Sequence, residues 1–266
     1  MRKKDSAALS ANAWHPLLPH SPGSNPTVVN QHPMTKQLAL GITLRKHADL
    51  ETFVAGGNHQ AVSDLTTCAR GKGEPFVYLW GGEGVGKSHL LQAACQLADE
   101  EQRSAAYIPL QQASEFHPDI LNDLDSLQLI CLDDIQQIAG SPNWEQAIFH
   151  LFNRLRDRGA SLLVSATQSP SALPLRLPDL ASRMNWGLCY QLQPLSDEEK
   201  QHALTSGAAR RGLEMSNDTA AYILRHTPRD MESLQNLLDR LDHASLEAQR
   251  RLTTPFVRSF LTASRD

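Results

Sequence analysis

The 266-residue chain has little of several features that mark whole classes of protein. Its four cysteines are widely spaced, with no pair at metal-ligand or redox spacing, so we expect reduced, buried thiols. No apolar run approaches the length of a membrane span, and the opening residues are too interrupted for a secretory signal. A net charge of −4 argues against a global basic field for nucleic acid, and the dispersed histidines form no metal cluster. What remains is a cytoplasmic globular protein.

The order of patterns along the chain predicts two domains after an unstructured beginning. Residues 1–36 are rich in Pro, Asn, Ser and His and are predicted to be a disordered tail, with Met34 as an alternative start. Residues 50–193 alternate buried strands with helices, which is typical of an α/β domain with a parallel sheet. Strands are expected at 76–80, 105–110, 127–132, 161–165 and 188–192, and helices at 60–69, 87–98 and 144–158.

Residues 194–266 form the second predicted domain. Helices are expected at 196–211, 217–226, 229–247 and 254–263, with no strand evident in this stretch. Ser196 followed by Glu199 is a capping box that marks the first helix. The pattern therefore indicates a small all-helical domain.

The strongest motif is Gly81-Gly82-Glu83-Gly84-Val85-Gly86-Lys87-Ser88, which fits G-x-x-x-x-G-K-[ST] between a strand and a helix. The glycines allow successive N–H groups to point at a polyphosphate, and the following helix adds its positive end. Lys87 reaches terminal phosphates and Ser88 ligates Mg²⁺. The predicted contacts at this loop are Gly82, Gly84, Val85, Gly86, Lys87, Ser88 and His89, although His89 also suits helix packing.

Two acids end the third predicted strand. Carboxylates at the carboxyl end of a parallel strand lie beside a phosphate loop, so Asp133 is expected to hold Mg²⁺ together with Ser88. Asp134 is expected to polarise a water. An ordinary strand-to-turn junction is the alternative.

Three segments, at 75–91, 132–140 and 180–187, resemble in the same order the motifs of the bacterial replication initiator DnaA. The resemblance covers residues 50–263 and implies the AAA+ fold: an αβα domain with strand order 5-1-4-3-2 and a helical lid. Two departures set the chain apart from initiators. No helix-turn-helix pattern follows residue 263, and the stretch between Tyr107 and Asp133 is short.

A tetrapeptide before the AAA+ core narrows the resemblance to the DnaA-like regulatory inactivators of DnaA. Gln37, Leu38 and Leu40, within 37–41, resemble the motif that binds the β sliding clamp of DNA polymerase III. Gly41 stands where an apolar residue usually follows, so Ile42 or Leu44 is the alternative pocket filler.

The resemblance also assigns roles to single residues. Arg183 matches an arginine finger that acts in trans on ATP bound by DnaA, and such a finger is worth ~10³–10⁵ in rate. Arg229 matches the lid arginine that touches the chain's own nucleotide, ADP or a related one. Thr167 stands where DnaA has Asp, which implies weak or absent hydrolysis at this site. Phe53 and Val54 match the segment around the base, for which a Gly-rich docking loop is the alternative.

The resemblance thus implies a negative regulator of replication initiation. It would act on DnaA from the DNA-loaded clamp, touch DNA only through that clamp, and form homo-oligomers. A DnaA-like initiator or helicase loader that acts directly on DNA is the first alternative. An autonomous ATPase or small-molecule kinase is the second.

Overall fold

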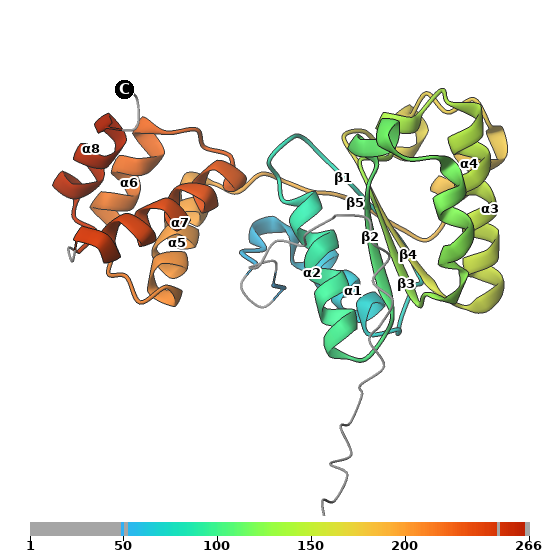
Figure 1. Ribbon diagram of the computed structural model, residues 1–266, viewed down its shortest axis with the longest axis horizontal. Coiled ribbons are helices and arrows are strands. Elements are labelled where there is room, and N and C mark those ends of the chain that lie inside the picture. Colours follow the sequence, from blue (N-terminus) through green and yellow to red (C-terminus); the bar gives the residue numbers. More distant parts are fainter. Residues whose placement is uncertain (1–48, 51–52, 249–250, 264–266) are drawn as a thin grey trace, which may run out of the picture. The chain divides into compact units, whose positions relative to one another are not determined.

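A computed structural model of the protein describes residues 49–50, 53–248 and 251–263 (Figure 1). The predicted tail at 1–36 and the clamp-binding segment at 37–41 lie outside the described residues.

Five parallel strands form the sheet of the α/β domain. They are β1 Phe76–Trp80, β2 Ala105–Pro109, β3 Leu129–Asp133, β4 Ser161–Ala166 and β5 Leu188–Gln191. The order across the sheet is β2-β3-β4-β1-β5, and every pairing is parallel. This confirms the expected order 5-1-4-3-2. Because β1 and β3 lie on either side of β4, the residues that follow these two strands meet at one edge of the sheet.

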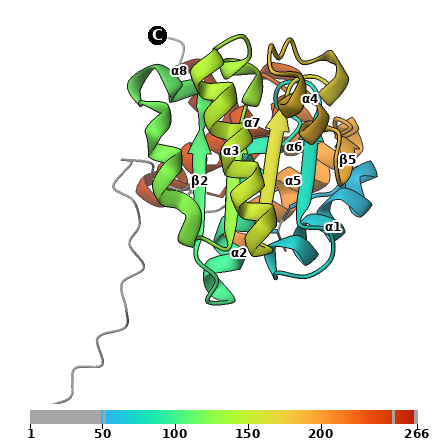
Figure 2. The ribbon, with the colours of Figure 1, turned by 90° about the vertical axis from the view of Figure 1, so that its right-hand side faces the viewer.

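Helices cover both faces of the sheet, as the alternation of side chains along β1 requires. Val77 and Leu79 face α1 (His59–Ala69) and α2 (Lys87–Glu100), whereas Phe76 and Tyr78 face the other side. That second face is covered by α3 (Pro142–Arg158) and α4 (Pro178–Met184) (Figures 1 and 2). Strands buried on both faces explain the continuously apolar runs in the sequence.

The structure also differs from the expected elements. The sequence did not predict α4, because its seven residues bury only Leu180 and Met184, too few for a visible period. β2 ends at Pro109, one residue early, where a 3-10 run, Leu110–Glu115, begins. β2 is an edge strand, where a proline is tolerated.

The four lid helices are α5 Asp197–Arg210, α6 Asn217–His226, α7 Met231–Ala248 and α8 Thr254–Ala263. They enclose their own leucine-rich core, and the predicted capping box at Ser196 and Glu199 is present. α7 begins at Met231 rather than at 229, because Asp230 accepts the Ser233 N–H at 2.7 Å and so caps the helix. Among the described residues, no helix has the length and apolarity that a bilayer span requires.

The cysteines are free thiols, and one differs from expectation. Cys68, Cys95 and Cys131 are buried as predicted, but Cys189 on β5 is exposed. The Sγ atoms of Cys95 and Cys131 lie 3.3 Å apart between α2 and β3. Burial raises the pKa of the Cys131 thiol well above its usual range, which disfavours the reactive thiolate.

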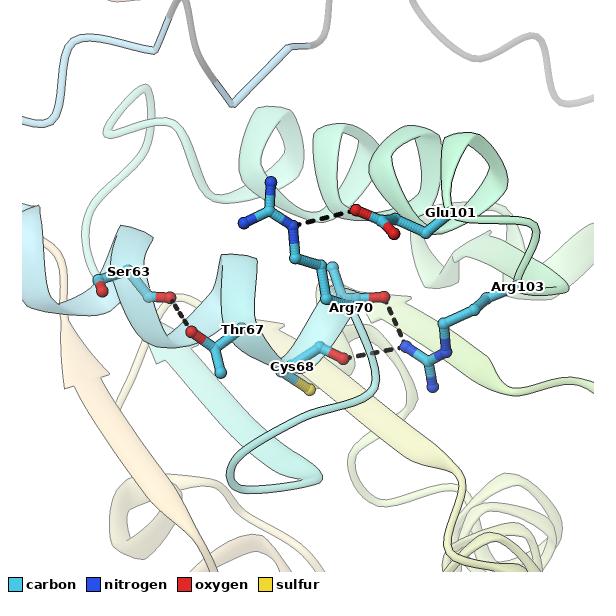
Figure 3. Close-up of polar contacts among 7 residues, drawn as sticks. Ser63, Thr67, Cys68, Arg70, Glu101 and Arg103 are labelled. Atoms are coloured by element: carbon cyan, nitrogen blue, oxygen red, sulfur yellow. Dashed lines mark hydrogen bonds and ion pairs between the residues drawn. The ribbon is translucent and has the colours of Figure 1, made fainter.

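One arginine fastens the carboxyl end of α1 to the sheet. Arg103 donates to the carbonyl oxygens of Cys68 and Ala69, which lie in the last turn of α1 (Figure 3). It also donates to the Gln128 carbonyl just before β3, at 3.1 Å. Arg70 pairs nearby with Glu101 at 3.2 Å. These contacts tie the carboxyl ends of α1 and α2 to each other and to the start of β3.

Gly187, between α4 and β5, is a position where we expect any side chain to be costly. Its φ is +69°, and a Cβ there would lie 2.3 Å from the Phe76 carbonyl oxygen. Gly187→Ala is expected to lower the free energy of unfolding by about 3 kcal/mol, or ~6–12 °C in melting temperature. Gly159→Ala is the matched control, because its φ of +67° is similar but nothing lies within 4 Å. An equal loss of unfolding free energy in the two variants would show that the contact between the new Cβ and the Phe76 carbonyl oxygen costs nothing.

Candidate nucleotide site and surface arginine

The phosphate loop connects β1 to α2, as the motif predicts. Gly84 and Gly86 have φ of +72° and +100°, which glycine adopts without the strain of a Cβ. Lys87, the first residue of α2, is buried and donates to the carbonyl oxygens of Gly81 (3.0 Å) and Gly82 (2.8 Å). The ammonium is thereby held across the loop, where phosphates would be received at the start of α2.

The charge on Lys87 is set by opposing effects. Burial lowers the pKa of the ammonium, while the nearby carboxylates of Asp134, Asp133 and Glu83 raise it. The negative charge of a bound polyphosphate would raise the pKa of Lys87 further. The two strand-end acids are therefore electrostatic neighbours of the phosphate-loop lysine, as the sequence predicts.

Asp133 ends β3 and is tied to both neighbouring strands. Its Oδ2 accepts from the Tyr107 hydroxyl of β2 at 2.5 Å, and its Oδ1 accepts from the Ser165 hydroxyl of β4. Burial and the adjacent Asp133 charge raise the pKa of Tyr107, so this phenol stays a neutral donor. Sequence reasoning missed Tyr107 and Ser165. The strand order places both beside Asp133, and that order was available only from the family resemblance.

Asp134 has φ of +60° and is engaged by two side-chain amides. Gln111 donates to its Oδ2 at 2.6 Å, and Gln136 donates to its Oδ1 at 2.9 Å. The Oε1 of Gln136 in turn accepts the N–H of Thr167 at 3.2 Å. The predicted acid and the predicted end-of-strand threonine are thus joined through Gln136, a residue to which the sequence assigned no role.

A pocket of about 1140 Å³ lies over the phosphate loop. Nine of the predicted nucleotide-site residues line it: Phe53, Val54, Gly84, Val85, Gly86, Lys87, Ser88, His89 and Arg229. Asp230 of the lid, which was not predicted, lines it beside Arg229. The predicted residues Gly82, Asp133, Asp134 and Thr167 are outside this lining.

The predicted base-side residues lie against the loop. A Cβ on Gly86 would come within 2.9 Å of the Phe53 ring, and the Phe53 and His89 rings have centroids 5.5 Å apart. Asn58 exchanges hydrogen bonds of 2.9 and 2.8 Å with the Gln193 main chain. This pairing fixes the predicted base segment to the end of the sheet domain.

The lid contributes its own charges to the pocket. Asp230 lies against the phosphate loop, because a Cβ on Gly84 would stand 2.8 Å from the Asp230 Cβ. Arg229 lines the same pocket, with its guanidinium donating to the Leu224 carbonyl at 3.1 Å and to Asp197 at 3.2 Å. Asp230 is therefore a lid residue that packs against the loop, and sequence reasoning did not single it out.

Arg183 lies in the last turn of α4, and its surroundings differ from those of a structural arginine. Its Cζ stands 4.3 Å from the ring centroid of Trp186 and 5.7 Å from that of Phe152. Trp186 is 45% exposed, although it is a large apolar residue. Within the described part of the chain, Arg183 has no acidic partner and is not in the lining of the nucleotide pocket. Among the described residues, the guanidinium therefore stacks on aromatic rings rather than pairing with an acid.

A parallel 2-3-4-1-5 sheet, a phosphate loop after β1, acids at the end of β3 and a helical lid define an AAA+ nucleotide-binding protein. The chain belongs to the DnaA family: the model of the bacterial DnaA ATPase domain matches residues 44–191. The model of the Hda lid domain matches residues 197–261. Together these matches show a DnaA-related replication regulator with an Hda-like lid.

The chain is also similar to a relative of comparable length and to solved structures. An uncharacterized protein of Haemophilus influenzae is 44% identical over 229 residues, which cover 86% of this chain and 99% of that protein. Domain III of Thermotoga maritima DnaA superposes with a TM-score of 0.67 at 21% identity, covering 80% of this chain and 95% of that one. AMPPCP-bound DnaA from Aquifex aeolicus gives a TM-score of 0.63 at 21% identity, covering 75% and 66%. These structural likenesses concern the fold.

Proposed function

We propose that this protein inactivates the replication initiator DnaA by presenting Arg183 to ATP bound on DnaA. Hydrolysis of that ATP would leave the initiator in its inactive ADP form. The observation that carries the proposal is the environment of Arg183, which is stacked on Trp186, without an acidic partner among the described residues, and away from the chain's own pocket. A cation offered in this way suits a phosphoryl group held by another protein.

The chain's own pocket is assigned a supporting role in this proposal. Lys87 and the loop N–H groups would hold the phosphates of ADP or a related nucleotide, and Arg229 would approach them from the lid. Ser88 and Asp133 supply the hydroxyl and carboxylate oxygens that Mg²⁺ prefers. Asp134 already accepts from Gln111 and Gln136, so these two amides compete with a water for its oxygens. We therefore infer weak or absent hydrolysis here, with the nucleotide acting to order lid and core.

The third part of the proposal is a tether. Residues 37–41 would bind the β sliding clamp through Gln37, Leu38 and Leu40, with the leucines entering apolar pockets. A clamp on DNA would then bring DnaA and Arg183 together, which makes their encounter effectively intramolecular. DNA would be contacted only through the clamp.

Gln37→Ala/Leu38→Ala is expected to abolish clamp pull-down and to lower stimulation on DNA-loaded clamps by about 10²-fold, within the range of a lost effective concentration. Raising the concentration of the variant should restore the rate, since Arg183 is unchanged. The neighbouring pair Thr35→Ala/Lys36→Ala is the control. Full stimulation by a variant that no longer binds the clamp would show that clamp binding through residues 37–41 is not needed.

A further inference from the structure

Glu145, in the first turn of α3, is a fully buried carboxylate to which neither the sequence analysis nor the proposed function assigns a role. Within the described residues it forms no ion pair with a lysine or arginine. A buried carboxylate without a cation persists only where hydrogen-bond donors replace its hydration. The donors around Glu145 therefore identify the segments of the chain that this side chain holds in place.

Three backbone N–H groups from two other segments surround this carboxylate. Gly140 donates to Oε1 at 2.7 Å, and Leu177 donates to Oε2 at 2.7 Å. The N–H of Arg176 is shared between the two oxygens, at 3.1 Å to Oε1 and 2.9 Å to Oε2. Both carboxylate oxygens are thus engaged by main chain, and the positive end of α3 adds to their stabilisation.

The segments that Glu145 joins lie on either side of it. Gly140 belongs to the turn after the strand-end acids, whereas Arg176 and Leu177 directly precede α4. Leu177 is the N-cap of α4 without a side-chain cap of its own, and its carbonyl accepts from Ala181 at 3.1 Å. A seven-residue helix has little stability by itself, so its position depends on such anchors.

The opposite end of the same segment is also fixed. Gly187 passes so close to the Phe76 carbonyl that no Cβ fits. Leu180 and Met184 hold the middle of α4 by complete burial. Arg183 lies between these anchors, so the position of its side chain depends on how both ends of the segment from 176 to 187 are held.

We propose that Glu145 is a positioning residue for Arg183, which it orients by binding the main chain at the start of α4. The catalytic consequence of this inference rests on the proposed function. The structural claim, that Glu145 anchors the start of α4, does not depend on it. Glu145 does not line the nucleotide pocket, so its effect on Arg183 is separable from nucleotide binding.

The first test is Glu145→Gln, a substitution of nearly the same shape. An amide nitrogen would face backbone N–H groups and so repel at least one of them. We expect the maximal stimulated rate of DnaA-bound ATP hydrolysis to fall about 10–100-fold, as for a displaced catalytic group. The concentration giving half-maximal stimulation and the affinity for ADP should change less than threefold. Glu115→Gln, at an exposed position, is the control for loss of charge.

The second measurement is hydrogen exchange of the free protein. In Glu145→Gln, peptides covering 174–186 should exchange faster, while those covering 76–100 should remain as in the wild type. If Glu145→Gln does not fold, Glu145→Asp keeps the charge with a shorter reach and should show the same local pattern with a smaller loss of rate. A folded variant with unchanged exchange at 174–186 and stimulation within twofold of wild type would overturn the inference.

The two proposals fail in different ways. If Arg183→Ala removes stimulation but folded Glu145→Gln does not, the proposed function stands and the positioning role is wrong. If Arg183→Ala stimulates fully, the proposed function is wrong, and the exchange at 174–186 still decides whether Glu145 anchors α4.

Discussion

Arg183→Ala is expected to lower the stimulated hydrolysis of DnaA-bound ATP by about 10³-fold or more, the range measured for arginine fingers. The loss is this large because the guanidinium would neutralise charge that develops in the transition state, whereas ground-state contacts contribute little. Arg183→Lys should recover only a small part, since an ammonium lacks the planar fork that stacks on Trp186 and donates at the same time. The measurement is phosphate release from DnaA with saturating DNA-loaded clamp.

The Arg183 variant should otherwise behave as the wild type. Its clamp binding and affinity for ADP are expected to be unchanged, because Arg183 does not line the pocket. Its melting temperature should fall by only ~1–4 °C, since the lost stacking on Trp186 is worth ~0.5–1 kcal/mol. Arg70→Ala is the matched control, as this arginine pairs with Glu101 on the other face of the sheet. Undiminished stimulation by folded Arg183→Ala would show that another group acts on the ATP.

Lys87→Ala is expected to weaken binding of ADP to the isolated chain by about 10–150-fold. This corresponds to the ~1.5–3 kcal/mol of a hydrogen bond to a charged group. The substitution also removes a cation that interacts with Asp133 and Asp134, which adds repulsion toward phosphate. Isothermal titration would give the affinity, and the rise in melting temperature on adding ADP should shrink accordingly.

Lys72→Ala, at an exposed position before β1, is the control for loss of a positive charge. If the nucleotide orders lid and core, Lys87→Ala should also reduce stimulation of DnaA, and excess ADP should restore it. An ADP affinity within twofold of wild type would contradict the role assigned to the loop lysine.

The phosphate loop and the fold could be predicted because their signals are local. The glycine spacing at 81–88 follows from the backbone conformation that the loop needs, and strands buried on both faces appear as continuous apolar runs. The strand order came only from the resemblance to DnaA, since periodicity does not say which strands are neighbours.

The partners of the site residues could not be predicted in the same way. Tyr107 and Ser165 reach Asp133 only because β2 and β4 flank β3, and Glu145 meets Leu177 across 32 residues of chain. In the sequence, a buried glutamate in a helix cannot be distinguished from an exposed polar residue. Its hydrogen bonds go to main-chain groups, which leave no mark in the side-chain pattern.

The clearest test of the account is to identify which bound ATP is hydrolysed. DnaA would be loaded with γ-labelled ATP and this protein with unlabelled ADP, before both are mixed with DNA-loaded clamp. We expect rapid release of label with wild-type protein, and release at the rate of DnaA alone with Arg183→Ala. Equal release with the two proteins, or no acceleration by the wild type, would contradict it.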